Sequence, residues 1–443
     1  MRLALITAGG AGMFCGSCMH DNTWVRALRR QGADATLIPT YTPIRVDEED
    51  VSERRVFLGG VNVYLDYRWR WWSRLPRRLV RWLDSRWLLR LATVFGVSND
   101  AAKLGELTVA LLEGPRGPQR REIDELVAFL CDRLRPDAIC FSNVLLGGVL
   151  PSLRDRFAGP IVCTLQGDDI FLESLPKPYR ERALALIRSH VRLCDGFFVH
   201  SRYYRDFMSE YLSEPVERFR RITLGIDVTA HTGTPRKRTG TPFTVGYLAR
   251  ICLEKGVDRV IDAFCRWHQR RGDVRLEIAG YLGARDRRFF RRVLSAARRR
   301  IGDAVRYVGS PPDQLAKVRF LQGVDVLSVP TRYREPKGLY VLESLANGVP
   351  VVQPRHGAFP ELVDATGGGL TFPPEELDEL VAAWDRLADD EDFRLALAAR
   401  GRTAVRERFN ADVMAAETLQ HFEELLRTRA GKGPVRHSAG RSE

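Results

Sequence analysis

The sequence lacks any hydrophobic run long enough to cross a membrane. Spanning a bilayer takes about 20 consecutive apolar residues, and no apolar stretch in this chain of 443 residues approaches that length. The N-terminal MRLALITAGG makes a poor signal peptide, because its apolar run is short and is ended by glycines. We therefore expect a cytoplasmic protein.

The sequence also lacks the paired patterns of a metal site. Of its eight cysteines only Cys15 and Cys18 form a CxxC, and no second CxxC or HxxxH follows at a useful spacing. A single CxxC supplies half of a zinc site, so reduced thiols in a packed loop are the simpler interpretation. His20 and His200 fit no site pattern, and we expect structural roles for both. No metal ion or other cofactor is predicted.

Acidic residues are in the minority, since 56 Asp and Glu stand against 69 Lys and Arg, for a formal net charge of +13. Such an excess suits nucleic acid, an anionic membrane surface or small anionic substrates. The sequence contains no RNP, zinc-finger or helix-turn-helix signature, which argues against nucleic acid.

One segment, residues 67–91, is unusually dense in both arginine and tryptophan. A helix beginning at Arg77 would separate its arginines from its leucines onto two faces. Tryptophan and arginine on an amphipathic segment suit the surface of an anionic membrane, and the acceptor would then be a lipid or a lipid-linked glycan. The alternative is an insertion that packs on its own domain and leaves its arginines solvated.

Short apolar runs alternate with helical patterns along most of the chain. Runs of this kind, four to six residues long, are typical of parallel strands buried on both faces. The first series lies at 3–7, 35–38, 138–141, 161–164 and 196–199. The second series lies at 243–246, 274–279, 305–308, 326–329 and 349–352. The predicted fold class is α/β, with two Rossmann-like doubly wound domains facing a cleft.

A stretch rich in Thr, Gly, Pro and charge, VTAHTGTPRKRTGT, separates the two series. The predicted order of parts is an N-terminal acceptor-side domain, a linker, a C-terminal nucleotide-sugar-binding domain, a helix crossing back to the first domain, and a disordered tail. Their bounds are 1–227, 228–241, 242–410, 411–428 and 429–443.

The start of the second series carries a candidate anion site. A predicted strand ends at Gly246, the following loop presents Arg250 and Lys255, and a helix begins near Gly256. Arginine grips a phosphate as a fork, lysine as a point charge, and a helix N-terminus adds free N–H groups. The alternative is a solvated basic loop.

A second candidate is the stretch REPKGLYVLESLANGVPVV, residues 334–352. Glu335 precedes a helix that Gly338 opens, and Glu343 lies one turn inside that helix. Gly338 lets a ligand approach the backbone, and the helix N-terminus can receive a diphosphate. Glu343 could then hold ribose hydroxyls and Glu335 sugar hydroxyls, provided that the basic pair neutralises the diphosphate. The alternative is an exposed loop acid and a solvated helix acid.

In this order and at these spacings, the motifs make the chain resemble the retaining GT-B glycosyltransferases of glycosyltransferase family 4. The acidic pair of that family, spaced E-x7-E, matches Glu335 and Glu343, and its basic phosphate pair matches Arg250 and Lys255. The resemblance covers roughly residues 1–425. It implies that Glu335, Arg250 and Lys255 are catalytic.

The resemblance implies further donor-binding residues and shows one departure. Gly309 and Ser310 resemble the loop that holds the nucleotide base, and Gly338 and Leu339 form the helix start at the diphosphate. Lys337 stands where the family commonly has an apolar residue. Its side chain either adds charge near the donor or points to solvent, and we expect solvent.

In the first half, the resemblance places Gly10 and Gly12 at the cleft near the donor. The alternative interpretation of this glycine loop is a dinucleotide-binding fingerprint. That fingerprint requires an acidic residue at the end of the second strand, and the sequence has none there. Many family members carry a histidine where this chain has Gln166, which can bind a sugar hydroxyl but cannot donate a proton at neutral pH. Asp168 or Asp169 either orients the acceptor hydroxyl or caps the helix that follows.

The resemblance thus implies a metal-independent retaining transferase. It would move a hexose-type sugar from a nucleotide-diphosphate sugar to a hydroxyl acceptor, plausibly a lipid-linked or cell-envelope glycan. In such enzymes the departing diphosphate takes the proton of the incoming hydroxyl, so the protein supplies orientation and charge stabilisation. The alternatives are a nucleotide-sugar epimerase and a non-catalytic nucleotide-sugar-binding protein on the same fold.

Overall fold

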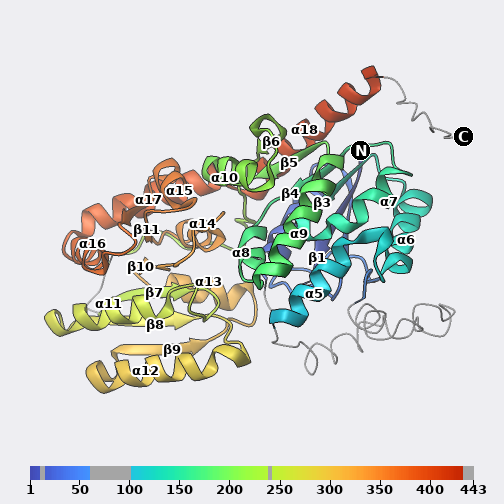
Figure 1. Ribbon diagram of the computed structural model, residues 1–443. Helices are drawn as coiled ribbons and strands as arrows, with labels where there is room; N and C mark the ends of the chain where they lie inside the picture. Colours follow the sequence, from blue (N-terminus) through green and yellow to red (C-terminus); the bar gives the residue numbers. More distant parts are fainter. Residues whose placement is uncertain (10–14, 60–100, 238–241, 433–443) are drawn as a thin grey trace, which may run out of the picture.

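The computed structural model describes residues 1–9, 15–59, 101–237 and 242–432. The predictions for Gly10, Gly12 and the segment 67–91 lie outside the described residues. Two six-stranded sheets, each flanked by helices, organise the described chain (Figure 1). The predicted α/β class with two doubly wound domains is confirmed.

The N-terminal sheet is parallel throughout, in the order β2-β1-β3-β4-β5-β6. Its strands are β1 (Arg2–Ala8), β2 (Asp34–Thr40), β3 (Ala138–Phe141), β4 (Ile161–Thr164), β5 (Gly196–Val199) and β6 (Phe219–Arg221). Along β1, Ala4 and Ile6 enter one hydrophobic core, while Leu3 and Leu5 enter another. Burial on both faces explains why β3, β4 and β5 are continuous apolar runs.

The C-terminal sheet is also parallel, in the order β12-β11-β10-β7-β8-β9. Its strands are β7 (Phe243–Leu248), β8 (Val274–Ala279), β9 (Val305–Gly309), β10 (Val326–Leu327), β11 (Val351–Pro354) and β12 (Gly369–Phe372). The strand order reverses between β7 and β10. Such a switch point is where open α/β sheets bind ligands, at the carboxyl ends of the strands.

Helices connect the strands in both domains. In the first half they are α1 (Gly16–Arg30), α5 (Ala101–Leu112), α6 (Arg120–Ala128), α7 (Leu150–Arg154), α8 (Asp168–Glu173), α9 (Lys177–His190) and α10 (Arg202–Leu212). In the second they are α11 (Val257–Arg270), α12 (Arg287–Ile301), α13 (Gln314–Gln322), α14 (Leu339–Ala346), α15 (Phe359–Thr366), α16 (Leu377–Asp389), α17 (Glu391–Arg408) and α18 (Ala411–Lys432). No helix within the described ranges has the length and apolar character needed to cross a membrane.

Helix α11 shows how a local sequence sets the geometry near the switch point. Its apolar side chains, among them Val260, Phe264 and Trp267, are buried in the C-terminal core. Gly256 is its N-cap, with φ of +72° in the left-handed region. A Cβ at this position would collide with the carbonyl oxygen of Pro330, so glycine brings the start of α11 against the loop after β10.

The last helix, α18, belongs to the first domain. Met414, Ala415 and Phe422 enter the core on one face of the N-terminal sheet, and Trp24 Nε1 of α1 donates to Thr418 Oγ1 at 3.0 Å. Figure 1 shows α18, in red, running past β5 and β6. The helix continues to Lys432, so the expectation of a disordered tail from residue 429 is wrong for 429–432.

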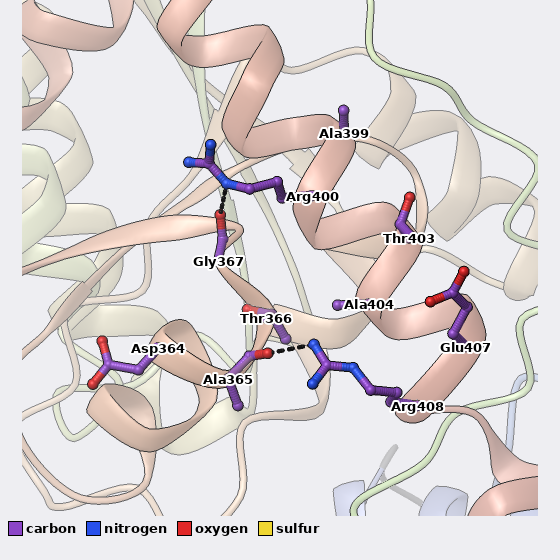
Figure 2. Close-up of a pocket in the computed structure, with 10 residues that line it drawn as sticks. All are labelled: Asp364, Ala365, Thr366, Gly367, Ala399, Arg400, Thr403, Ala404, Glu407 and Arg408. Atoms are coloured by element: carbon purple, nitrogen blue, oxygen red, sulfur yellow. Dashed lines mark hydrogen bonds between the residues drawn. The ribbon is translucent and has the colours of Figure 1, made fainter.

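Helices α15 and α17 enclose a hollow on the C-terminal domain (Figure 2). Arg400 Nε donates to the carbonyl oxygen of Gly367 at 3.2 Å, and an Arg408 guanidinium nitrogen donates to that of Ala365 at 2.7 Å. These arginines of α17 satisfy carbonyl groups at the C-terminus of α15, where cations are favourable. All residues that line the hollow belong to the C-terminal domain. Its polar contacts are explained by helix capping.

Candidate active site

A cavity of about 320 Å³ lies between the two domains. From the first domain it is lined by Cys15, Gly16, Met19 and Asp47. From the second it is lined by Leu248, Ala249, Arg250, Lys255, Gly280, Tyr281, Ser310, Pro311, Lys317, Leu339, Tyr340 and Glu343. Much of this lining follows β7, β8 and β9 directly, so the cavity occupies the carboxyl edge of the C-terminal sheet, as expected for this topology.

The two predicted cations, Arg250 and Lys255, both line the cavity from the loop between β7 and α11. Lys255 Nζ lies 2.7 Å from Glu335 Oε2 and over the rings of Tyr333 and Tyr340, at 4.9 and 5.3 Å from their centroids. Arg250 is exposed and, within the described ranges, forms no ion pair as short as that of Lys255. Although burial opposes its charge, Cys252 and the carboxylate of Glu254 raise the pKa of its guanidinium. Arg250 is therefore available to an anion in the cavity.

Glu335 lies in the loop after β10 and is only 5% exposed, so it is not the open loop acid considered as an alternative. Besides Lys255, its Oε2 accepts hydrogen bonds from the hydroxyls of Tyr333, at 2.9 Å, and Tyr340, at 3.4 Å. Burial alone would raise the pKa of this carboxyl, but Lys255, the Tyr333 hydroxyl and Lys337 together outweigh it, and the pKa falls below its ordinary value. Glu335 is thus held as a carboxylate, with all three contacts on one oxygen.

Glu343 lines the cavity from α14 and is held by a residue that the sequence did not reveal. Lys317 of α13 places Nζ 2.6 Å from Glu343 Oε1 and 2.6 Å from Asp47 Oδ2 of the first domain. Although burial opposes its charge, the two carboxylates raise the pKa of Lys317 above its ordinary value. The only sequence signal is position, since Lys317 stands four residues before the buried Leu321 on the inner face of α13.

Helix α14 begins at the cavity. Gly338 is its N-cap with φ of +81°, and Leu339 and Tyr340 of its first turn line the cavity. The free N–H groups of this turn give the site partial positive charge. Gly309, which ends β9 with φ of +92°, precedes Ser310, which also lines the cavity.

The expectation that Lys337 points to solvent is wrong. Lys337 is 7% exposed, and its Nζ donates to Gln166 Oε1 of the first domain at 2.5 Å. The amide nitrogen of Gln166, itself 8% exposed, donates to Asp21 Oδ1 at 2.8 Å. Burial lowers the pKa of Lys337, with Asp21 and Glu335 opposing that shift. Lys337 and Gln166 therefore form a buried polar link between the domains.

Asp168 and Asp169 are both engaged by protein groups. Asp168 accepts hydrogen bonds from the backbone N–H of Val144, at 2.7 Å, and of Gln166, at 2.9 Å. Burial raises the pKa of Asp168 to about 6 despite these bonds. Asp169 accepts a hydrogen bond from the Tyr204 hydroxyl at 2.6 Å. Both aspartates fix the loop that carries Gln166, and neither lines the cavity.

His20 and His200 pack against each other inside the first domain, with ring centroids 4.7 Å apart. Burial lowers the pKa of both imidazoles, which favours their neutral forms. His20 Nδ1 lies 3.1 Å from Asp21 Oδ1, and His200 Nδ1 lies 3.0 Å from the carbonyl oxygen of Ile222. In the parts of the chain that the structure describes, no three His, Cys, Asp or Glu side chains gather as metal ligands.

Residues 235–404 match the model of the family described as Glycosyl transferases group 1. The chain is 26% identical over 280 residues to a glycogen synthase of Mycobacterium tuberculosis. That alignment takes in 63% of this chain and 65% of the relative, so the chain spans less than two thirds of the length of that relative.

Two solved structures share the fold across nearly the whole chain. Sucrose-phosphate synthase of Thermosynechococcus elongatus has a TM-score of 0.70 at 19% identity, covering 97% of this chain and 100% of that one. Alr3699/HepE of Anabaena, solved in complex with UDP-glucose, has a TM-score of 0.62 at 16% identity, covering 94% and 99%. The chain is thus similar to group 1 glycosyl transferases over residues 235–404, and as a whole it has the two-domain GT-B fold.

Proposed function

We propose that this protein is a retaining glycosyltransferase of family 4, moving a hexose-type sugar from a nucleotide-diphosphate sugar to a hydroxyl acceptor. The observation that carries the proposal is the convergence of Arg250, Lys255, Glu343 and the N-terminus of α14 on one cavity between the domains. The family match over residues 235–404 and the binding of UDP-glucose by HepE support the same assignment.

The cavity supplies what a diphosphate leaving group requires. Arg250 and Lys255 would neutralise it, and the first-turn N–H groups of α14 would donate to its oxygens. These groups act on the charge that develops as the bond to the sugar breaks, which is where preorganised donors lower the barrier. We propose that they suffice without a metal ion.

The two glutamates take different parts in this scheme. Glu343 faces the cavity from α14, one turn from its start, and would accept hydrogen bonds from the ribose. Glu335 uses one carboxylate oxygen for its protein contacts, and the other would hold the hydroxyls of the transferred sugar. No described carboxylate or histidine is both free and in the cavity to act as a base. The proton of the incoming hydroxyl would therefore pass to the departing diphosphate, on the face of the sugar that the diphosphate leaves.

We propose a lipid-linked or cell-envelope glycan as the acceptor, and action at the cytoplasmic face of the membrane. The support is the composition of residues 67–91, which combines arginine with tryptophan. Binding to anionic but not to neutral vesicles is the expected result, and equal binding to both would argue against this acceptor class.

The test begins with thermal unfolding in the presence of UDP-, GDP- and ADP-sugars, because a ligand of the folded state raises its apparent stability. One nucleotide should raise the unfolding temperature, and its sugar should be transferred with retained anomeric configuration, read by NMR. Glu335→Gln should bind that nucleotide and abolish most turnover, while Lys255→Ala is less informative because it leaves Glu335 buried and unpaired. A fully active Glu335→Gln, or transfer with inversion, would overturn the proposal.

A further inference from the structure

The proposed transfer makes no use of the CxxC formed by Cys15 and Cys18. Cys15 is the N-cap of α1, with an extended backbone, and Cys18 occupies the third helical position. Side chains at these two positions lie together over the first turn of a helix, as they do in a capping box. The pair stands between β1 and β2 of a βαβ unit, where a CxxC is typical of redox motifs.

The two thiols have unlike surroundings. Cys15 is partly exposed and lines the cavity between the domains. Cys18 is fully buried, and its S–H donates to the carbonyl oxygen of Ala8 at 3.0 Å. A small molecule in the cavity can therefore reach Cys15, whereas Cys18 is buried and does not line the cavity.

Several groups favour the thiolate of Cys15. The neighbouring Cys18 lowers the pKa of the Cys15 thiol to about 6 against the effect of burial, and the charge of Lys337 adds to the lowering. The N-terminus of α1 favours a negative charge at the same place. The neighbouring Cys15, and after it burial, raise the pKa of Cys18 well above its ordinary value, so Cys18 stays a thiol.

We propose that Cys15 and Cys18 are a reversible dithiol–disulfide pair, oxidised by a peroxide that enters through the cavity between the domains. The Cys15 thiolate attacks one oxygen of hydrogen peroxide, the O–O bond breaks, and the released hydroxide takes a proton to become water. Cys18 then gives up its proton as its sulfur attacks the sulfur of the sulfenic acid on Cys15. The S–S bond forms, the S–O bond of the sulfenic acid breaks, and the leaving hydroxide takes the Cys18 proton as a second water.

This inference goes beyond the proposed function and does not depend on it. Both thiols belong to the chain itself, so the chemistry is measurable whether or not a nucleotide sugar binds. The oxidised state would replace a charged, reachable sulfur in the cavity wall with a neutral one, and it would remove the S–H donor from Ala8 at the end of β1.

The experiment treats the reduced full-length protein with hydrogen peroxide, blocks the remaining thiols and maps the peptides by mass spectrometry. The expected product is a Cys15–Cys18 linkage that forms before any other cysteine is modified and that dithiothreitol reverses. Cys131, which is partly exposed and has no cysteine partner, is the internal control and should be modified far more slowly. The proposal would be overturned if a disulfide between other cysteines formed first, or if all accessible thiols were oxidised at similar rates.

A variant separates the two steps. In Cys18→Ser, sulfenic acid should persist on Cys15 and be captured by dimedone, while Cys131→Ser should give the wild-type linkage. If dimedone labelled Cys15 equally in the wild-type protein and in Cys18→Ser, Cys18 would not be the thiol that reacts with the sulfenic acid on Cys15. That result would contradict the proposed dithiol–disulfide pair. Should Cys18→Ser fail to fold, the wild-type peptide map decides the question alone.

Discussion

Arg250 and Lys255 line the same cavity but differ in their partners. Lys255 is tied to Glu335 at 2.7 Å, so removing either one leaves the other charge in a largely buried place. Arg250 is exposed, and its interactions with Cys252 and Glu254 are weaker than a buried ion pair. Its substitution therefore tests ligand binding with little effect on folding.

We predict that Arg250→Ala weakens binding of the donor nucleotide while leaving stability nearly unchanged. A hydrogen bond to a charged group contributes about 1.5–3 kcal/mol, so the dissociation constant should rise about tenfold or more. The free energy of unfolding should change by no more than about 0.5 kcal/mol, as at most surface positions. Calorimetry and chemical denaturation measure the two quantities.

The matched control is Arg306→Ala. Arg306 is an exposed arginine on β9 of the same sheet, and it does not line the cavity. Equal weakening by both substitutions would mean that overall charge, rather than a contact in the cavity, governs binding.

We predict that Cys15 reacts with iodoacetamide at a pH where ordinary cysteines do not. The reaction needs the thiolate, and the Cys15 pKa of about 6 lies below the ordinary thiol value, so the reactive form is present above pH 6 and is lost as pH falls through it. Burial raises the pKa of Cys131, which should react only under more alkaline conditions. Peptide-resolved alkylation rates between pH 5 and 9 test this, and parallel pH profiles for the two residues would contradict it.

At the scale of elements, α13 connects the domains through one buried side chain. Lys317 is 9% exposed and lies between Asp47 of the first domain and Glu343 of α14. The backbone N–H of Gln314, in the first turn of α13, also donates to the carbonyl oxygen of Asp47 at 3.2 Å. This helix therefore positions both a wall of the cavity and the neighbouring domain.

We predict that Lys317→Met destabilises the protein by about 3–5 kcal/mol, because it leaves two carboxylates buried side by side without a cation. Chemical denaturation measures the loss. The control is Lys177→Met, since Lys177 is an exposed lysine whose pair with Glu181 spans 3.8 Å on the surface. That substitution should cost about 0.5 kcal/mol or less. Equal losses for both lysines would mean that burial of the Lys317 cluster has no consequence.

Elements with a strong apolar signal were predictable from the sequence. The strands at 138–141, 161–164, 196–199 and 274–279 have the predicted bounds, because each is a continuous buried run. Strands β6 and β12 were missed. β6 ends in two exposed arginines and β12 begins with a glycine, so their pairing with a neighbouring strand, and not their composition, makes them strands.

The candidate site was predictable where its residues share a local motif, and not where two domains meet. Arg250 and Lys255 lie in one loop, which the sequence could place. Asp47 lies outside any helix or strand. The side chain of Lys337 is buried because it hydrogen-bonds Gln166 of the other domain. Contacts of this kind depend on how the two domains pack against each other. The hydrophobic periodicity that reveals helices and strands in a sequence carries no information about that packing.

At the scale of the whole molecule, contacts beside the cavity hold the domains together. Glu361 of α15 accepts hydrogen bonds from the backbone N–H groups of Arg202 and Tyr203, at 2.9 and 2.6 Å, at the start of α10. Glu361 of the C-terminal domain thus caps the N-terminus of α10 in the N-terminal domain, where negative charge is favourable. The chain also crosses between the domains twice, and the crossings pair where Ile226 meets Asn410.

We predict that a chain ending at residue 227 does not fold on its own, although it holds the entire N-terminal sheet. It lacks α18, and so leaves uncovered the core to which Met414, Ala415 and Phe422 contribute. Size-exclusion chromatography and dye binding to exposed apolar surface should show aggregation or a loose state. Joining residues 411–432 to its end through a flexible linker should restore cooperative unfolding. A monomeric, cooperatively unfolding 1–227 would contradict this.

The return of α18 to the first domain also bears on how the protein is made. Domains of a growing chain generally fold in the order in which the ribosome releases them. Here the hydrophobic face beside Trp24 is covered by a helix that is synthesised after the whole second domain. The C-terminal domain can therefore be completed first, and the core of the N-terminal domain, though its sheet is synthesised earlier, is completed only once α18 has been made.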